Sequence, residues 1–491
     1  MLPTPGVPRL ELEEELRKHV PDEAKEFVRS VLSRLLACER EIDRTLEALD
    51  GCYVEPGPAG NPTRGDVDVL PTGKNFYSVD PRKVPTRRAW KVGKKLAENT
   101  IERYLEEHGR YPESVGIVLW ASDVMRTGGE VLSQVMWLLG VRPEWDESGI
   151  VSGFEVVPLE ELERPRIDVV VRISGMFRDA FPNLVKFLDE VFEAVRELDE
   201  PEGWNFVRKH ALDHRIFGDP PGAYGAGVNY AVHASAWDDR SDLADVYVRW
   251  GGYAYGSDVY GEEAFSEFRR ALSTVRAVSV NQSSHEWDVL SCCCHFAFHG
   301  GMVAAAEHHS GERVECYHHD TTDPHRVITR PIEEELVRLV EQKLANDEWI
   351  EAMLEHGAKG VGEWLKRVEN LFGWDATTGR VPSECYEKIE DVLERYGPRF
   401  SDENPYAVEY ARERLLEAKK TGSVALADDV GRVLLHLRLD ADVLVGLDDQ
   451  RVDHGDDRPD RRRVLDRTEQ QVVAAQRRRH YVGAPVGGLV G

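Results

Sequence analysis

The feature that most limits the fold of this chain is an alternation of strand-like and helix-like segments. Val115–Trp120 (VGIVLW) is a short apolar run rich in β-branched residues, as expected of a buried strand. Gly129–Val141 has helical spacing of its apolar residues. A second strong strand, Arg166–Ser174, is followed by an amphipathic helical segment over Asn183–Leu198. Strand–helix–strand order of this kind favours parallel strands covered by helices.

The predicted fold class is therefore α/β, multi-domain, with parallel or mixed sheet layers, flanking helices and a helical C-terminal region. Further helical text lies before this segment, over Leu10–Leu49, and after it, over Ile332–Leu371 and Cys385–Lys420. Five intervals are expected: a helical lead-in (1–50), an α/β domain with flavodoxin-like alternation (51–204), a mixed α+β site region rich in Gly and His (205–330), a helical region (331–422) and an atypical tail (423–491).

The last interval differs from the rest of the chain in composition. From Val424 onward it has no lysine and a single glutamate, Glu469, but many Arg, Asp and Val residues. A disordered tail is one interpretation, and the product of a shifted reading frame is another. Composition does not decide between them.

The charge balance indicates which kinds of partner the chain can bind. The chain has 62 basic and 89 acidic residues, a net charge of −27, which argues against nucleic acid as a partner and suits work in concentrated salt. No window reaches the ~18–20 apolar residues of a membrane span, and the N-terminus lacks the features of a signal peptide. We expect a cytoplasmic protein. Its seven cysteines do not form a disulfide framework.

Two glycine-containing phrases resemble nucleotide-binding loops only superficially. PTGKNF (Pro71–Phe76) lacks the spacing and the Ser or Thr of a phosphate loop. GAYGAG (Gly222–Gly227) lacks the glycine order of a dinucleotide fingerprint. We therefore expect that this chain does not itself bind ATP.

Potential metal ligands are concentrated in one part of the chain. Eight of the 17 histidines lie between His285 and His325, among carboxylates and three consecutive cysteines. These are the donors that divalent transition metals prefer. No H-E-x-x-H motif and no pair of C-x-x-C knuckles accompanies them. Two interpretations remain open: transient or catalytic contact with a metal, or a polar loop region with incidental histidines.

The three cysteines, Cys292–Cys294, stand in the phrase SCCCHFAFHGG. On an extended segment Cys292 and Cys294 would point one way and Cys293 the other. Two thiolates with His295 or His299 could hold a soft metal. In the alternative interpretation the cysteines are small apolar fillers beside a site whose chemistry rests on its neighbours.

Several longer phrases, taken in order, resemble the large (H) subunit of the cobaltochelatase (CobN) and magnesium chelatase family, in its C-terminal portion. They are colinear over Glu47–Ala418, and FHGGM (Phe298–Met302) resembles the cobalt-type branch. Family large subunits are more than twice this length, and their upstream H-G-T-x-E-W-L-P-G-K motif is absent here. The matching phrases are LEALDGCYVEPGPAGNPTRG, VLPTGKNFYSVDPRKVPT, VLWASDVMRTGGEVLSQVMWLLGVRP, RPRIDVVVRISGMFRDAFP, RIFGDPPGAYGAG, VRWGGYAYG, FHGGM, NDEWIEAMLEHGAKG, FGWDATTG and ENPYAVEYARERLLEA.

The resemblance implies a metal–nitrogen bond-forming ligase: insertion of a divalent metal into a corrin-type tetrapyrrole in cobalamin biosynthesis. Cobalt is the expected metal, with magnesium or nickel as other options. ATP would be hydrolysed by AAA+ partner subunits, and a separately encoded N-terminal half is a further possible partner. The alternatives are a truncated or split-gene tetrapyrrole-binding subunit without activity alone, a magnesium chelatase-type subunit acting on a porphyrin, and a thiolate metal protein.

The same resemblance supplies candidate site residues. Glu286, Asp288 and His299 keep the family's residue types, whereas Cys292–Cys294 and His295 stand where an acidic and aromatic run is more usual. Insertion needs a general base for the ring N–H protons, ligands that stage the metal, and aromatic or charged groups that hold the macrocycle. The candidates are Glu286, Asp288 and His299 for catalysis, His295, His299 and Glu286 for metal, and Arg178, Asp179, Tyr224, Trp250 and Tyr253 for the tetrapyrrole.

Overall fold

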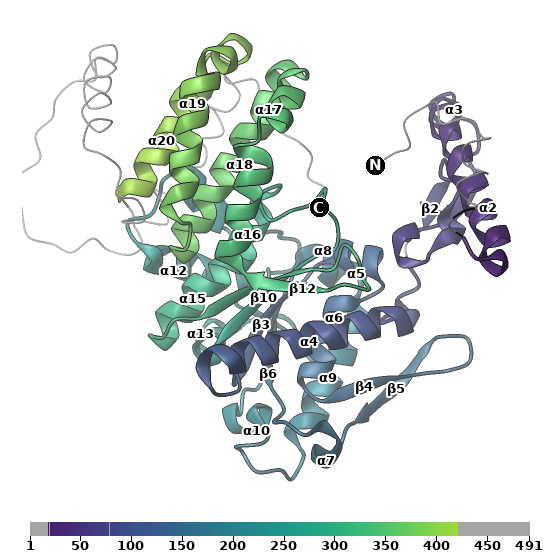
Figure 1. Cartoon of the computed structure of the whole chain (residues 1–491). Helices are drawn as coiled ribbons and strands as arrows, with labels where there is room; N and C mark the ends of the chain where they lie inside the picture. Colours follow the sequence, from purple (N-terminus) through teal and green to yellow (C-terminus); the bar gives the residue numbers. More distant parts are fainter. Residues whose placement is uncertain (1–17, 19, 78, 421–491) are drawn as a thin grey trace, which may run out of the picture.

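The structure, a computed structural model, describes residue 18 and residues 20–77 and 79–420. The predicted atypical tail, 423–491, lies outside the described residues. The N-terminal part forms a small unit beside the main body (Figure 1). It contains two parallel strands, in register from Pro56 opposite Asn75. Its elements are α2 (Asp22–Leu36), η1 (Ala37–Glu39), α3 (Arg40–Leu49), β1 (Pro56–Pro58), η2 (Pro62–Arg64), η3 (Val67–Val69) and β2 (Asn75–Tyr77).

The main body is built on one eight-stranded sheet of order β12-β11-β10-β3-β6-β7-β8-β9. The five strands from β11 to β7 are parallel, and β12, β8 and β9 are antiparallel to their neighbours. This mixed sheet confirms the predicted fold class. The strands are β3 (Ser114–Leu119), β6 (Asp168–Ile173), β7 (Ile216–Gly218), β8 (Tyr253–Tyr255), β9 (Tyr260–Glu263), β10 (Ala277–Gln282), β11 (Glu315–Asp320) and β12 (Ile328–Pro331). The predicted intervals 51–204 and 205–330 therefore both contribute strands to this one sheet.

Helices cover both faces of the sheet, so its central strands are buried throughout. In β3, Val115, Ile117 and Leu119 pack with one group of elements, whereas Val118 packs with a second group on the other face. The first group of elements comprises η4 (Pro81–Lys83), α4 (Arg87–His108), α5 (Ala121–Thr127), α6 (Glu130–Leu138), the hairpin β4 (Val141–Trp145) and β5 (Val151–Val156), α7 (Leu159–Leu162), α8 (Gly175–Ala180), α9 (Pro182–Arg196) and α10 (Phe206–His210). The second comprises α11 (Val228–His233), α12 (Arg240–Gly251), α13 (Phe265–Thr274), α14 (Cys293–His295), the π-helix η5 (Phe296–Gly300) and α15 (Gly301–Ser310).

The C-terminal part of the described chain is helical, and its helices stand together at one end of the body (Figure 1). The continuous helical text predicted over Ile332–Leu371 is divided into shorter elements. They are α16 (Ile332–Leu339), the π-helix η6 (Val340–Leu344), α17 (Asp347–Leu354), α18 (Gly357–Thr378), α19 (Ser383–Glu403) and α20 (Ala407–Lys420). In the described part of the chain, no helix has the length and apolarity that crossing a membrane requires.

The strand order creates a switch point in the middle of the sheet. From β3 the chain adds β6 and then β7 on one side, and later places β10 and β11 on the other. The segments that leave the carboxyl ends of β3 and β10 therefore diverge. In open α/β sheets such a divergence forms the crevice in which ligands bind.

Candidate functional site

The segments that follow β3 and β10 meet at this switch point. Trp120 comes directly after β3, and its indole ring packs on Phe298 with centroids 4.5 Å apart. The Trp120 Nε1–H donates to His299 Nε2 over 3.5 Å. The phrase FHGG, which the sequence places far from Trp120, thus lies at the carboxyl edge of the sheet.

His299 belongs to a π-helical turn, a wider turn that often marks functional sites. The two glycines that follow it allow close packing. A Cβ on Gly300 would lie 2.2 Å from Thr377 Oγ1 of α18, and one on Gly301 would lie 2.6 Å from the Tyr247 ring of α12. The glycines therefore fix His299 between two helices.

His295 and His299 form a stacked pair, with ring centroids 6.2 Å apart and planes within 14°. His299 is buried and His295 half-buried. In each ring Nδ1 has no hydrogen-bond partner among the described residues. Burial lowers the pKa of both, that of His299 well below the usual value. Both rings are therefore neutral at pH 7 and keep a nitrogen that can exchange a proton or contact a metal.

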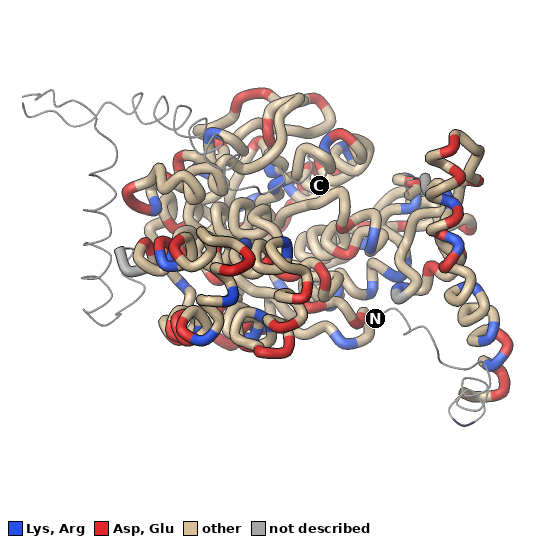
Figure 2. Tube along the Cα trace, turned by 90° about the horizontal axis from the view of Figure 1, so that it is seen from above, with Lys and Arg blue, Asp and Glu red and all other residues tan. Residues whose placement is uncertain are grey.

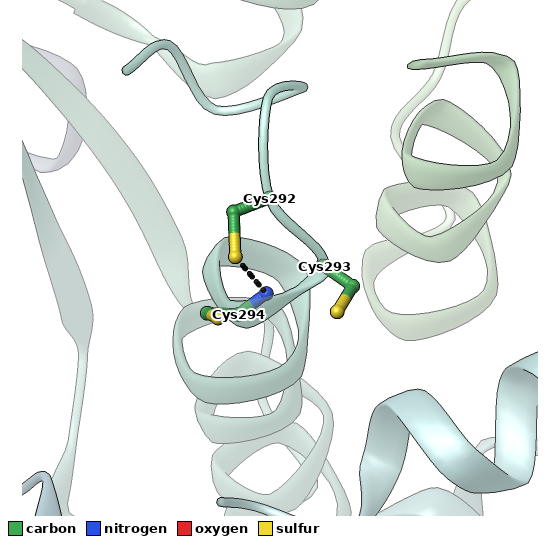
Figure 3. A group of neighbouring side chains, drawn as sticks. All are labelled: Cys292, Cys293 and Cys294. Carbon is green, nitrogen blue, oxygen red and sulfur yellow. Dashed lines mark hydrogen bonds between the residues drawn. The ribbon is translucent and has the colours of Figure 1, made fainter. Parts of the chain in front are cut away.

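The three cysteines precede this pair. Cys293 and Cys294 are helical, and Cys292 is the extended residue just before the helix. Cys292 caps α14, and its Sγ accepts a hydrogen bond from the Cys294 backbone N–H over 3.3 Å (Figure 3). All three Sγ atoms lie within 4.8 Å of one another. The alternation expected of an extended segment was wrong, because the helix begins at Cys293 and turns the side chains together. Hydrogen bonds from Cys293 and Cys294 lower the pKa of the Cys292 thiol.

The eight histidines between His285 and His325 do not form one centre. His318 and His319 are buried in β11, whereas His308 and His309 lie in the last turn of α15. Within the part of the chain that the structure describes, only the three cysteines bring three or more potential ligand atoms this close.

The two predicted carboxylates occupy one loop but differ in environment. Glu286 is exposed. Asp288 is 1% exposed, forms an ion pair with Lys343, and accepts from the Leu290 N–H over 2.8 Å. Its negative charge also acts on His295, where it partly offsets the effect of burial on the pKa. Asp288 thus holds the loop, and Glu286 is the carboxylate open to a ligand.

Three of the residues predicted to contact the tetrapyrrole lie on the other side of the switch point and are hydrogen-bonded to one another: Arg178, Asp179 and Tyr224. Arg178 donates twice to Asp179, over 2.7 and 3.1 Å, and once to Pro220 O over 2.8 Å. The Tyr224 hydroxyl donates to Asp179 over 2.8 Å. Hydrogen bonds from Arg178 lower the pKa of Asp179. Because the buried guanidinium is engaged within the protein, Arg178 shapes the loop that presents Tyr224.

Three aromatic side chains are exposed in this region: Tyr224 (47%), Tyr230 (41%) and Trp250 (37%). We call them the aromatic face. Tyr230 and Trp250 lie 5.7 Å apart, and a Cβ on Gly227 would lie 2.5 Å from the Trp250 indole. Glycine there lets the loop lie directly against the ring. Tyr253, also predicted, instead packs edge-on against Phe265 at 5.4 Å.

A buried arginine that the sequence did not single out connects the loop that carries Tyr224 with the π-helical turn that carries His299. Arg172 forms an ion pair with Asp219, donates to Gly225 O over 3.1 Å, and lies 5.0 Å from the Phe298 ring centroid. Asn229 of α11 also approaches Cys293 Sγ, at 3.8 Å. The sequence signal for this residue is the strand DVVVRI, because an arginine within an apolar strand needs a buried partner for its charge.

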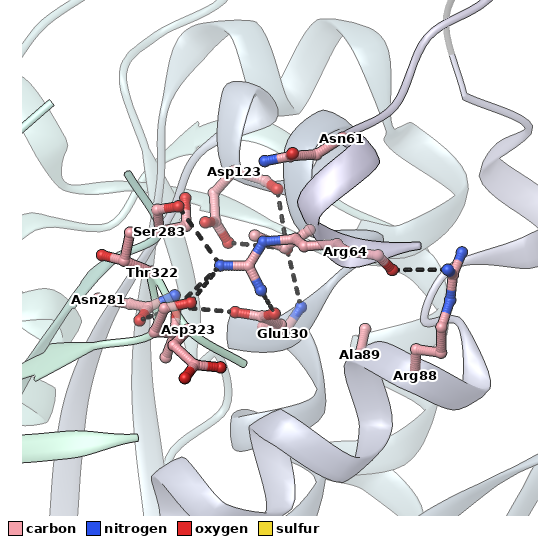
Figure 4. Close-up of polar contacts among 12 residues, drawn as sticks. Asn61, Arg64, Arg88, Ala89, Asp123, Glu130, Asn281, Ser283, Thr322 and Asp323 are labelled. Atoms are coloured by element: carbon pink, nitrogen blue, oxygen red, sulfur yellow. Dashed lines mark hydrogen bonds and ion pairs between the residues drawn. The ribbon is translucent and has the colours of Figure 1, made fainter. Parts of the chain in front are cut away.

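A second missed residue, Arg64, ties the N-terminal unit to the sheet (Figure 4). It forms a buried ion pair with Glu130 and donates to Thr321 O over 2.6 Å, just beyond β11. Burial raises the pKa of Glu130 to about 8. Burial also raises the pKa of the nearby Asp123 carboxyl, which follows β3.

The fold is that of an α/β protein whose candidate ligand region lies at a topological switch point, with histidines on one side and exposed aromatic rings on the other. The profile of the CobN/Magnesium Chelatase family matches residues 7–428. The chain belongs to this family, which confirms the resemblance inferred from its phrases.

Individual relatives agree with this assignment. The chain is 43% identical over 448 residues to an uncharacterized protein of Methanocaldococcus jannaschii (86% of this chain, 36% of the relative). It is 41% identical over 401 residues to the aerobic cobaltochelatase subunit CobN of Sinorhizobium sp (77% and 32%). It is 38% identical over 411 residues to the chloroplastic magnesium-chelatase subunit ChlH of Oryza sativa subsp. indica (79% and 29%).

Among solved structures, the catalytic subunit of cobaltochelatase from Mycobacterium tuberculosis matches with a TM-score of 0.79 and 41% identity. The match covers 84% of this chain and 37% of that one. The chain thus spans about a third of the length of these relatives.

Proposed function

We propose that this chain acts as part of a large-subunit-type metal chelatase in the cytoplasm, which inserts a divalent metal into a corrin-type tetrapyrrole in cobalamin biosynthesis. Cobalt is the expected metal, with magnesium or nickel as other options, and AAA+ partner subunits hydrolyse the ATP. The observation that carries the proposal is the stacked pair of a buried and a half-buried histidine beside the aromatic face, in a chain of this family.

The aromatic face supplies a surface for the macrocycle. Flat rings pack well on tyrosine and tryptophan, and exposed aromatic side chains hold such ligands at little entropic cost. Tyr224 is held by Asp179 and Arg178, so its ring is oriented before the ligand arrives. In this proposal Tyr224 and Trp250 contact the macrocycle, and Arg178 and Asp179 position the loop.

The histidine pair handles the protons. Ring N–H protons leave as the metal enters, and a neutral imidazole is a suitable acceptor. His299 is held by Trp120 and by the packing of the π-helix, and His295 stacks on it. Glu286, exposed on the same edge, can pass the proton to solvent. Asp288 keeps the loop in place through Lys343.

A partner surface lies on the N-terminal unit. Neither α2 nor α3 has a buried residue, although α3 carries an apolar stripe. Ile42, Leu46 and Leu49 share one face of α3 and are 70%, 56% and 78% exposed. We call them the α3 apolar stripe. Because the chain spans about a third of its relatives, we propose that the stripe packs against the part of the large subunit that this chain does not include.

The test is a titration of the purified chain with a cobalt-free corrinoid precursor, followed by Co²⁺ with and without AAA+ partners and ATP. Saturable binding of the precursor, followed by ATP-dependent insertion in the complex, is the expected result. Failure to bind the precursor would overturn the proposal. Binding without insertion, even after the remaining part of the subunit is supplied, would favour the tetrapyrrole-binding subunit without activity. Preference for a porphyrin and Mg²⁺ would favour the magnesium-type alternative.

A further inference from the structure

The cysteine trio, Cys292–Cys294, has no role in the function proposed above, yet its geometry is that of a ligand set. The three Sγ atoms lie within 4.8 Å of one another, whereas the sulfurs of a tetrahedral thiolate centre are about 3.8 Å apart. Small rotations of the three thiols would close this difference. All three are free thiols and half-buried, so solvent can deliver an ion to them.

Side chains around the trio supply further polar atoms. His295 follows on the same short helix, and its Nδ1 is buried without a hydrogen-bond partner among the described residues. Asn229 approaches Cys293 from α11 at 3.8 Å. His295 thus follows the trio directly in the chain, although no ring nitrogen of it joins the group of atoms within 4.8 Å of one another. The trio lies beside the helix that carries Tyr230 of the aromatic face.

The arrangement differs from a structural metal site. Structural zinc sites take ligands from separate segments and thereby hold them together. Here all three sulfurs come from consecutive residues, so a bound ion would cross-link nothing. The surrounding fold is already fixed by other contacts: Asn370 and Trp374 of α18 donate to the Leu290 and Val289 carbonyls over 2.7 and 3.0 Å. An ion held here can be released without loss of the fold.

We propose that Cys292, Cys293 and Cys294 form a thiolate site that binds a thiophilic divalent cation, of the Co²⁺ and Zn²⁺ class, and stages it for transfer to the macrocycle. The staging role rests on the proposed chelatase function, whereas the binding does not. Each thiol gives its proton to solvent as the metal binds, and recovers one as the metal leaves. Thiolates prefer such cations over Mg²⁺, so the trio selects the metal.

Co²⁺ alone is the probe for binding, with the full chain kept reduced. Binding of one ion should produce the thiolate-to-cobalt charge-transfer absorption, and excess Mg²⁺ should not abolish it. The triple variant C292S/C293S/C294S should lose the absorption and bind Co²⁺ at least about tenfold more weakly. C52S, which removes an exposed thiol elsewhere, should match the wild type. Co²⁺ binding without the absorption, or an unchanged triple variant, would overturn the site.

A variant that misfolds would be recognised by its circular dichroism, and C292S and C294S singly then replace the triple variant. Staging is measured in the reconstituted complex. The serine variant should need at least about tenfold more Co²⁺ for half-maximal insertion. An unchanged requirement would overturn staging while leaving the chelatase function intact. Thiolate binding of Co²⁺ with no insertion by any complex would instead count against the chelatase function.

Discussion

At the scale of single residues, the hydrogen-bond partners of the ring nitrogens decide which histidines can serve the site. Within the described part of the chain, His299 and His295 keep a ring nitrogen without a hydrogen-bond partner at the edge of the sheet, whereas both ring nitrogens of His319 have partners inside it. His319 Nδ1 meets Thr329 Oγ1 at 2.8 Å, and Nε2 meets Thr100 Oγ1 at 3.2 Å. The sequence contains eight histidines in one region but cannot separate these two kinds, because the partners of a ring depend on the sheet register and on residues distant in sequence.

His319 gives a prediction about stability and pH. Burial lowers its pKa to about 3, so the folded state keeps it neutral while the unfolded chain protonates it below about pH 6.5. Its contribution to stability is therefore present above pH 6.5 and lost as the pH falls toward 3. His319→Gln should flatten the fall in unfolding free energy between pH 6.5 and 4, measured with urea.

The control for this prediction is His325→Gln, which changes an exposed histidine of the loop after β11. It should leave the pH dependence of the unfolding free energy unchanged. Equal slopes for wild type and His319→Gln would contradict the account.

At the scale of elements, the sequence predicted strands and helices well where the period was long and regular. β3, β6, α6 and α9 lie where expected. The turn at Cys292–Gly301 could not be predicted in this way. Its conformation depends on Thr377, Tyr247 and Trp120, which are distant in sequence, and on a π-helical turn that follows neither a strand nor an α-helix period. The converging thiols and the stacked histidines follow from that turn.

The close packing of the π-helical turn is tested by alanine substitutions at two helical glycines, one packed against a neighbour and one not. Gly300→Ala places a Cβ against Thr377 and should destabilise the fold by about 1–3 kcal/mol. Gly362→Ala in α18 places a Cβ that meets no described residue within 4 Å, and it should stabilise the fold by about 0.5–1 kcal/mol. Thermal and urea unfolding measure both. If the two variants changed stability alike, the close approach at Gly300 would be refuted.

The α3 apolar stripe is tested by association. The rest of the family's large subunit is supplied as a separate polypeptide, and its affinity for the chain is measured by ultracentrifugation. Leu46→Glu should weaken binding by at least about tenfold, because a charge would be buried in the interface. Ala48→Glu adds the same charge about a third of a turn away from the centre of the stripe and should have a much smaller effect. Self-association of the chain through the stripe would contradict the choice of partner.

At the scale of the whole molecule, acidic residues outnumber basic ones and are spread along the described chain (Figure 2). With a net charge of −27, self-repulsion opposes the compact state. Raising KCl from about 0.1 M to about 1 M shortens the screening length from ~10 to ~3 Å and should raise the melting temperature. A melting temperature that falls over this range would contradict this view of the surface.

The central claim is that the macrocycle binds on the aromatic face while His299 takes part in the chemistry. The most direct test measures precursor binding and cobalt insertion together, in the reconstituted complex. Trp250→Ala should weaken binding by about tenfold. His299→Ala should bind the precursor normally and insert cobalt about 10²–10⁴-fold more slowly. Unchanged insertion by His299→Ala, or unchanged binding by Trp250→Ala, would contradict the claim.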